Sequence, residues 1–131
     1  KYGIDIAGVA EEDIDLALEL VRLDKEKNKI VELPLLVESE NLGQRKEGKT
    51  KTIAVKDFRQ GNRYSYILDA DPDSFHQRPI PDIISSAKTI LVNAVMGLTP
   101  HFSDGSMALY EAIDENRRAL KLYGEVILYR N

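Results

Sequence analysis

The chain has 131 residues, of which 43% are hydrophobic and 31% are charged. This length and composition are typical of one globular domain and exclude wholesale disorder. The absence of cysteine excludes a disulfide scaffold, a thiolate metal site and a cysteine nucleophile. Because no signal segment and no apolar run of membrane-spanning length is present, we expect a soluble, intracellular, cytoplasmic protein, whether complete or a fragment of a longer chain.

The net charge of −4 is distributed unevenly along the chain. Residues 1–43 and 64–131 are acidic, whereas in residues 44–63 lysine and arginine outnumber aspartate and glutamate by seven to two. Such an asymmetry is the one bulk feature that indicates a partner.

The first third of the chain predicts a strand, a helix and a second strand. Alternation predicts a short edge strand over residues 2–7. An apolar stripe, with acids in the first turns and lysines at the end, predicts a helix over residues 10–28. Residues 30–37 form a predicted strand, which Pro34 places at a sheet edge or a bulge.

The middle of the chain predicts a basic arm followed by a hairpin. Residues 38–51 are polar and are expected to form a mobile loop or an extended hairpin arm. Residues 52–59 and 63–69 are predicted to pair directly through a Gly61-Asn62 turn. The Asp/Pro-rich residues 69–73 indicate turn chemistry, in which aspartate side chains bond to nearby backbone.

Residues 80–97 fit two structures. A single helix is favoured because apolar and polar stripes run through the whole window, with Gly97 as its C-cap. The alternative is a short helix ending near Lys88 and a buried strand over residues 89–96. A last helix over residues 105–123 and a closing strand over residues 125–130 complete the prediction.

These elements predict one α+β domain over residues 1–131, in the order β-α-β-β-β-α-α-β. Its three helices would pack on a mixed or mostly antiparallel sheet. Under the alternative, residues 89–130 become a βαβ unit of an α/β fold, and residues 97–106 lie at the carboxyl end of a strand, where such folds bind ligands.

Two groups of residues are candidates for function. The first is a set of basic side chains that would bind a partner: Arg45, Lys46, Lys49, Lys51, Arg59 and Arg63. The second is His101 with Asp104, an acid–base residue and its orienting carboxylate. Neither the aspartates of residues 69–73 nor the two histidines match a metal-binding pattern, so no metal and no cofactor is predicted.

The leading hypothesis is a non-enzymatic binding or assembly module. It would self-associate or dock to a protein partner through the basic arm and the acidic helix. The alternatives are a small-ligand-binding or enzymatic domain using residues 97–106, and nucleic-acid contact through the arm. No membrane partner is expected.

Overall fold

The computed structural model describes residues 9–59 and 61–124. The chain divides into two compact units, one of Lys1–Glu32 with Arg59–Asn62, and one of Leu33–Phe58 with Arg63–Asn131. The first unit contains helix α1, and the second contains every other element. The predicted strands over residues 2–7 and 125–130 lie outside the described residues.

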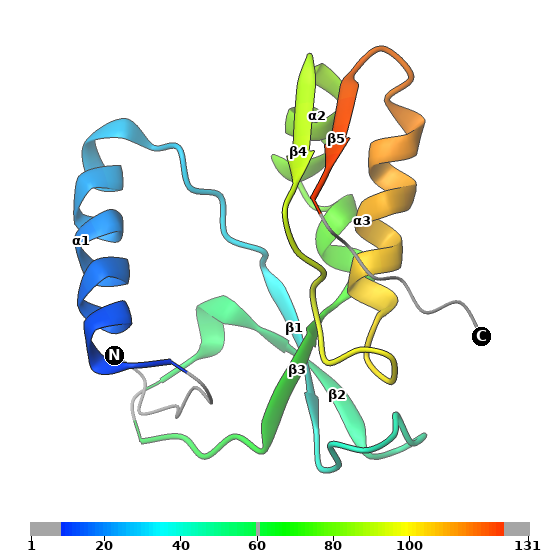
Figure 1. The fold of residues 1–131 in the computed structure, drawn as a ribbon. Helices are drawn as coiled ribbons and strands as arrows, with labels where there is room; N and C mark the ends of the chain where they lie inside the picture. Colours follow the sequence, from blue (N-terminus) through cyan, green and yellow to red (C-terminus); the bar gives the residue numbers. More distant parts are fainter. Residues whose placement is uncertain (1–8, 60, 125–131) are drawn as a thin grey trace. The chain divides into compact units, whose positions relative to one another are not determined.

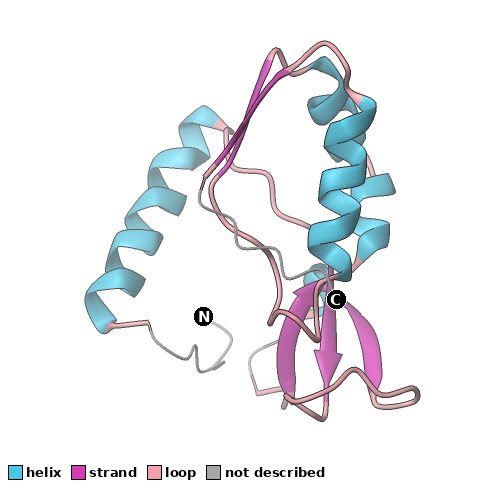
Figure 2. Ribbon diagram, turned by 45° about the vertical axis from the view of Figure 1, so that its right-hand side comes forward, coloured by secondary structure: helices cyan, strands magenta, loops and turns pink. Residues whose placement is uncertain are grey.

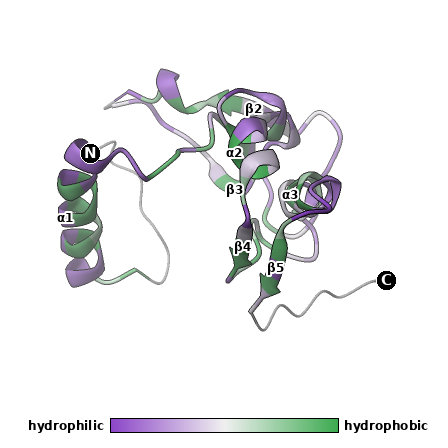
Figure 3. Ribbon diagram, turned by 90° about the horizontal axis from the view of Figure 1, so that it is seen from above, coloured by the Kyte–Doolittle hydropathy of each residue, from purple (hydrophilic) through white to green (hydrophobic). Residues whose placement is uncertain are grey.

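Helix α1 spans Glu11–Lys27 and confirms the helix predicted over residues 10–28. The Asp13 side chain accepts a hydrogen bond from the Ala10 amide at 3.0 Å, and Asn28 ends the helix in the left-handed conformation. Acids occupy the first turn and lysines the last, as the helix dipole favours. No residue of α1 is buried, and Figure 3 shows apolar and hydrophilic residues sharing its surface.

A three-stranded antiparallel sheet opens the second unit (Figure 2). Its strands are β1 (Leu35–Ser39), β2 (Thr50–Ala54) and β3 (Tyr66–Ala70), in the spatial order β2-β1-β3. The predicted direct pairing of residues 52–59 with 63–69 is therefore wrong. Strand β1 takes both neighbours, and β2 ends at Ala54, where the short 3₁₀ helix η1 (Val55–Asp57) begins.

The predicted edge position of Pro34 is also wrong, because β1 is the central strand. Pro34 lies just before the strand, so its missing N–H removes no ladder bond, and its carbonyl accepts from the Val55 amide at 2.8 Å. A bulge does occur in this strand, but it lies between Val37 and Glu38 and not at Pro34, from which it had been predicted.

The single helix favoured over residues 80–97 is wrong. Helix α2 covers Ile80–Ser86, and β4 covers Thr89–Val92. The Asn116 side-chain amide donates to the Ile84 carbonyl at 2.7 Å and to the Ala87 carbonyl at 2.9 Å, and so satisfies the end of α2. Strand β4 then pairs with β5 (Leu120–Tyr123) in parallel, which outweighs the helical periodicity.

Helix α3 spans Asp104–Glu115 and joins β4 to β5 (Figure 1). The last predicted helix is therefore shorter than residues 105–123, because its end becomes β5. The alternative βαβ prediction thus describes residues 89–123. α3 packs against α2, β3 and the 3₁₀ helix η2 (Pro72–His76). The most deeply buried apolar side chains are Phe102, Ile113 and Val37.

The predicted class, α+β with three helices and mixed sheets, is confirmed: one sheet is antiparallel and the other parallel. Among the described residues, the helices include none that combines the length and the apolar character needed to cross a membrane.

Candidate functional site

The loop of residues 93–103 connects the carboxyl end of β4 to α3 and is built around Gly97. Gly97 has φ of 80°. A Cβ atom there would lie 2.2 Å from the Phe102 carbonyl oxygen and 2.6 Å from Asp69 Oδ1. Because real Cβ atoms never approach so closely, the close contact between loop and β3 requires glycine.

Hydrogen bonds hold the part of this loop around Gly97 to the rest of the unit. The Ser106 hydroxyl donates to the Met96 carbonyl at 2.6 Å and accepts from the Met96 amide at 2.8 Å. The Leu98 amide donates to the Leu68 carbonyl at 2.8 Å. The Phe102 side chain is fully buried and anchors the loop in the core. These contacts stabilise the loop in the conformation seen here, which suits the positioning of a ligand.

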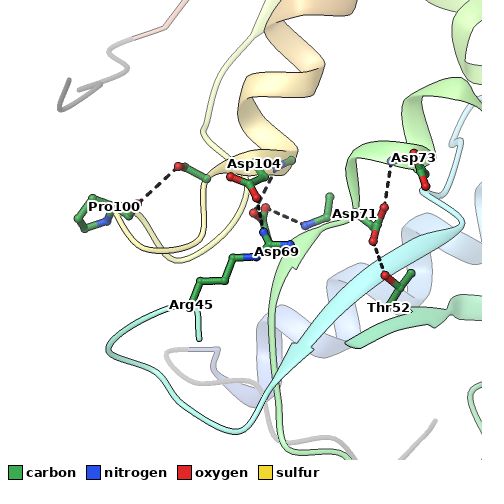
Figure 4. A network of polar contacts seen from close by, with 10 residues as sticks. Arg45, Thr52, Asp69, Asp71, Asp73, Pro100 and Asp104 are labelled. Carbon is green, nitrogen blue, oxygen red and sulfur yellow. Dashed lines mark hydrogen bonds and ion pairs between the residues drawn. The ribbon is translucent and has the colours of Figure 1, made fainter. Parts of the chain in front are cut away.

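Asp69, the penultimate residue of β3, is a buried carboxylate that lies beside the start of α3 (Figure 4). Its oxygens accept from the Ala70 amide at 2.9 Å and from the Gly105 amide, in the first turn of α3, at 3.2 Å. Burial raises the pKa of Asp69 and the charge of Asp104 adds to this, while the two amides and Arg45 lower it; the net shift is upward. Asp69 thus ties β3 to α3.

Asp104 opens α3 and forms an ion pair with Arg45, which comes from the connection between β1 and β2. The amino end of α3 therefore already carries the carboxylates of Asp69 and Asp104. With both carboxylates ionised and one guanidinium beside them, this helix end has a net negative charge, which disfavours phosphate groups there. In the described part of the chain, no group of three or more His, Cys, Asp or Glu residues is placed to hold a metal ion.

The predicted pair of His101 and Asp104 is not joined by a hydrogen bond, although the structure describes both residues. His101 is exposed, and Asp104 faces Arg45. A hollow of about 590 Å³ lies among η2, α2 and α3 and is lined by neither residue. Their role as an acid–base pair stays a prediction.

Three of the six predicted partner-binding bases are seen in ion pairs within the part of the chain that the structure describes. Besides Arg45 with Asp104, Lys49 pairs with Glu40 and Lys51 with Glu38, each at 2.7 Å. Among the other three, Lys46 and Arg63 are exposed, and Arg59 belongs to the unit that contains α1. The predicted contacts of this set with a protein or a nucleic acid stay predictions.

Sequence reasoning missed the structural importance of Asp69, Gly97, Gly105 and Ser106. Asp69 was predicted to be the last residue of a strand and the first of an Asp/Pro turn. It lies within β3, where a carboxylate is buried only if donors face it. That burial is visible only in the fold. One signal was available: Gly97 and Gly105 bracket a loop between a β-branched run and a helix, and isolated glycines there indicate close backbone approach.

Comparison with known proteins identifies relatives of this chain. The family model described as "Phosphoglycerate kinase" matches residues 1–126. A phosphoglycerate kinase of Dictyoglomus turgidum is 26% identical over 125 residues, which cover 94% of this chain and 30% of the relative. The phosphoglycerate kinase structure from Coxiella burnetii aligns with a TM-score of 0.68 and 22% identity, covering 92% of this chain and 31% of that one. The chain thus spans about 30% of the length of this curated relative.

These comparisons overturn the leading functional hypothesis. A non-enzymatic module for protein–protein interaction or oligomer assembly is wrong, because the matched family and both relatives are named as enzymes. The findings fit better with the alternative of a small-ligand-binding or enzymatic domain. The error arose because the charge asymmetry was interpreted as a surface for a partner, whereas Arg45, Lys49 and Lys51 neutralise acids of their own chain.

Proposed function

This chain belongs to the phosphoglycerate kinase family, and on that premise we propose that it forms part of an enzyme that transfers a phosphoryl group between a phosphoglycerate and a nucleotide. The observation that carries the proposal is the family match over residues 1–126, nearly the whole chain. Because the chain spans about 30% of a curated relative, it supplies one part of such a site. A cytoplasmic location belongs to the same proposal.

The part that this chain supplies is the loop of residues 93–103. In folds with parallel strands, ligands bind beyond the carboxyl ends of the strands. The parallel β4–α3–β5 unit puts the loop at that place. Hydrogen bonds from Ser106 and the fit of Gly97 against Asp69 stabilise this conformation of the loop.

The charges beside the loop indicate which portion of a substrate it contacts. Asp69 and Asp104 disfavour phosphate groups at the start of α3. The loop itself offers the apolar side chains of Val95, Met96 and Leu98. The uncharged portion of a nucleotide therefore suits this loop, and the phosphates lie away from it. Phosphoryl transfer depends mainly on positioning and on electrostatic stabilisation. The role of the loop in it is positioning.

Nuclear magnetic resonance of the ¹⁵N-labelled full chain tests this proposal. Magnesium–ATP and 3-phosphoglycerate are added in separate titrations. We expect magnesium–ATP to shift amide signals of residues 93–106 in a saturable way and to leave α1 signals unchanged. Inorganic triphosphate, which lacks the base and the sugar, should not shift the loop. Absence of loop shifts with magnesium–ATP, or equal shifts with triphosphate, would contradict the proposed role.

A further inference from the structure

The connection between β1 and β2, residues 40–49, is an ordered arm. The Glu40 amide donates to the Lys49 carbonyl and the Lys49 amide to the Lys46 carbonyl, both at 3.1 Å. The ion pair of Lys49 with Glu40 closes the base of the arm. Arg45 comes directly before the turn that the Lys49 to Lys46 bond closes, so these bonds restrict where the arm can place Arg45.

Arg45 contacts a segment that is remote in sequence. Its guanidinium pairs with Asp104, 59 positions away, at the first residue of α3 (Figure 4). The next residue, Gly105, donates its amide to Asp69, which also contacts Gly97 in the loop. The ion pair therefore connects the arm to the start of α3, and the Gly105 hydrogen bond connects the start of α3 to Asp69, against which the loop packs.

The two carboxylates of Asp69 and Asp104 attract the Arg45 guanidinium to the start of α3. Asp69 and Asp104 are two carboxylates close enough for the charge of Asp104 to raise the pKa of Asp69, and the charge of Arg45 lowers it again. The side chains of Arg45 and Asp104 are 36% and 55% exposed, so water weakens their attraction. A contact of this kind opens and closes readily and contributes little to global stability.

From this geometry we propose that Arg45 is a positioning residue that latches the arm to α3 and so holds the loop of residues 93–103 closed against Asp69. The latch acts on the loop without a ligand, and its effect on nucleotide binding rests on the proposed function. Arg45 acts through Asp104 and Gly105, and it touches no reacting atom in this assignment. When the pair opens, the start of α3 loses its link to the arm, and the loop exchanges faster between closed and open conformations.

The test uses the ligand-free full chain and four variants. Arg45→Gln removes the positive charge. Arg45→Lys keeps the charge but lacks the planar guanidinium, which can form two parallel hydrogen bonds with a carboxylate. Lys46→Gln is the matched control, because Lys46 is an exposed neighbour on the same arm. Arg45→Asp combined with Asp104→Arg reverses the pair and should restore the latch. The readouts are hydrogen exchange of the loop amides and the pH titration of the Gly105 amide signal, which reports ionisation of Asp69.

We expect Arg45→Gln to speed loop exchange about three- to five-fold, the factor that a partly exposed ion pair accounts for. The midpoint of the Gly105 titration should rise, because a cation beside Asp69 is lost. Lys46→Gln should change neither readout, and the reversed pair should return loop exchange to the wild-type rate. Equal behaviour of Arg45→Gln and Lys46→Gln would overturn the latch.

Two further measurements keep the result interpretable. If Arg45→Gln does not fold, raised salt on the wild-type chain must speed loop exchange, since screening weakens the exposed pair; unchanged exchange overturns the proposal. Titration with magnesium–ATP separates the two proposals. If wild type does not bind the nucleotide but Arg45→Gln still loosens the loop, the proposed function fails and the latch stands.

Discussion

At the scale of single residues, Gly97 and Asp69 determine how the loop of residues 93–103 meets β3. Asp69 is a buried carboxylate whose oxygens accept hydrogen bonds from two backbone amides. Gly97 packs so closely against it that a side chain at position 97 would collide with Asp69. Local sequence could predict part of this chemistry: Asp71 does bond to the Asp73 amide, as expected of an Asp/Pro turn. It could not predict Arg45 with Asp104, because their approach depends on the fold of the whole unit.

The close packing around Gly97 gives the first prediction. Gly97→Ala should destabilise the protein more than Gly48→Ala does. Both glycines have positive φ, but an added Cβ at Gly48 meets nothing within 4 Å. Gly48→Ala should cost about 1 kcal/mol from the backbone conformation alone. Gly97→Ala should cost about 1–3 kcal/mol more, the range for overpacking. Chemical denaturation measures both, and equal losses would contradict the close contact.

Glu38 gives a prediction about pH. Burial of the side chain raises its pKa. The hydrogen bonds from Lys51 and from the Ser65 amide, together with the charge of Lys51, lower the pKa by more, so the pKa lies below the ordinary value of 4.5. The folded state therefore binds fewer protons at this site than the unfolded state does. The free energy of unfolding should fall as the pH drops through 4.5 towards the folded pKa.

Glu38→Gln should flatten this part of the stability curve, as measured by denaturation between about pH 3 and 7. Glu40→Gln is the matched control, because Glu40 is exposed and pairs with a lysine of the same arm. If Glu40→Gln flattens the curve as much as Glu38→Gln does, the buried carboxylate is not the cause.

At the scale of elements, local signals predicted α1 well, because its charges and its cap lie within the helix itself. They failed for residues 80–97, where apolar residues fit a helical period but β4 gains a partner in β5, 28 residues beyond its end. The hairpin failed for a similar reason: β2 and β3 each pair with β1, which sequence reasoning had placed at an edge. Competition between possible partners is decided by the assembled sheet.

The boundary between α2 and β4 depends on Asn116, and this gives a third prediction. Asn116→Ala should destabilise the protein by about 1–3 kcal/mol, because the Ala87 carbonyl loses its donor and the Ile84 carbonyl keeps only the longer bond from the Ala87 amide. Glu115→Ala, a change at the exposed preceding position, should stay within about 0.5 kcal/mol of wild type. Thermal or chemical denaturation gives both values. A loss at Asn116 no larger than that at Glu115 would show that the helix end is satisfied by other groups.

At the scale of the whole molecule, the chain contains two units of unequal internal packing. All the buried residues that the structure describes belong to the unit of sheets, α2 and α3. Sequence reasoning predicted one domain and found no family, since the likeness to phosphoglycerate kinases is spread thinly over nearly the whole chain. A weak match distributed in this way forms no compact motif, so it is visible only when the full length is compared.

The exposure of α1 gives a fourth prediction. Hydrogen exchange should find the amides of α1 less protected than those of β1 and α3. A helix of 17 residues without buried side chains depends mainly on its own hydrogen bonds and caps, which are marginal in water. Mass spectrometry of exchanging peptides in the ligand-free chain gives this comparison. Protection of α1 equal to that of α3 would mean that its apolar stripe is covered in solution.

The central position of β1 also bears on the kinetics of folding. Strand β1 meets β2 across the short arm of residues 40–49, whereas β3 must arrive from beyond η1 and residues 58–65. Closing a short loop has a smaller entropic barrier than closing a long one. We expect the β1–β2 hairpin to nucleate the sheet and β3 to add later. Changes in the arm should then slow folding, whereas changes in β3 should mainly speed unfolding, and stopped-flow chevron plots measure both rates.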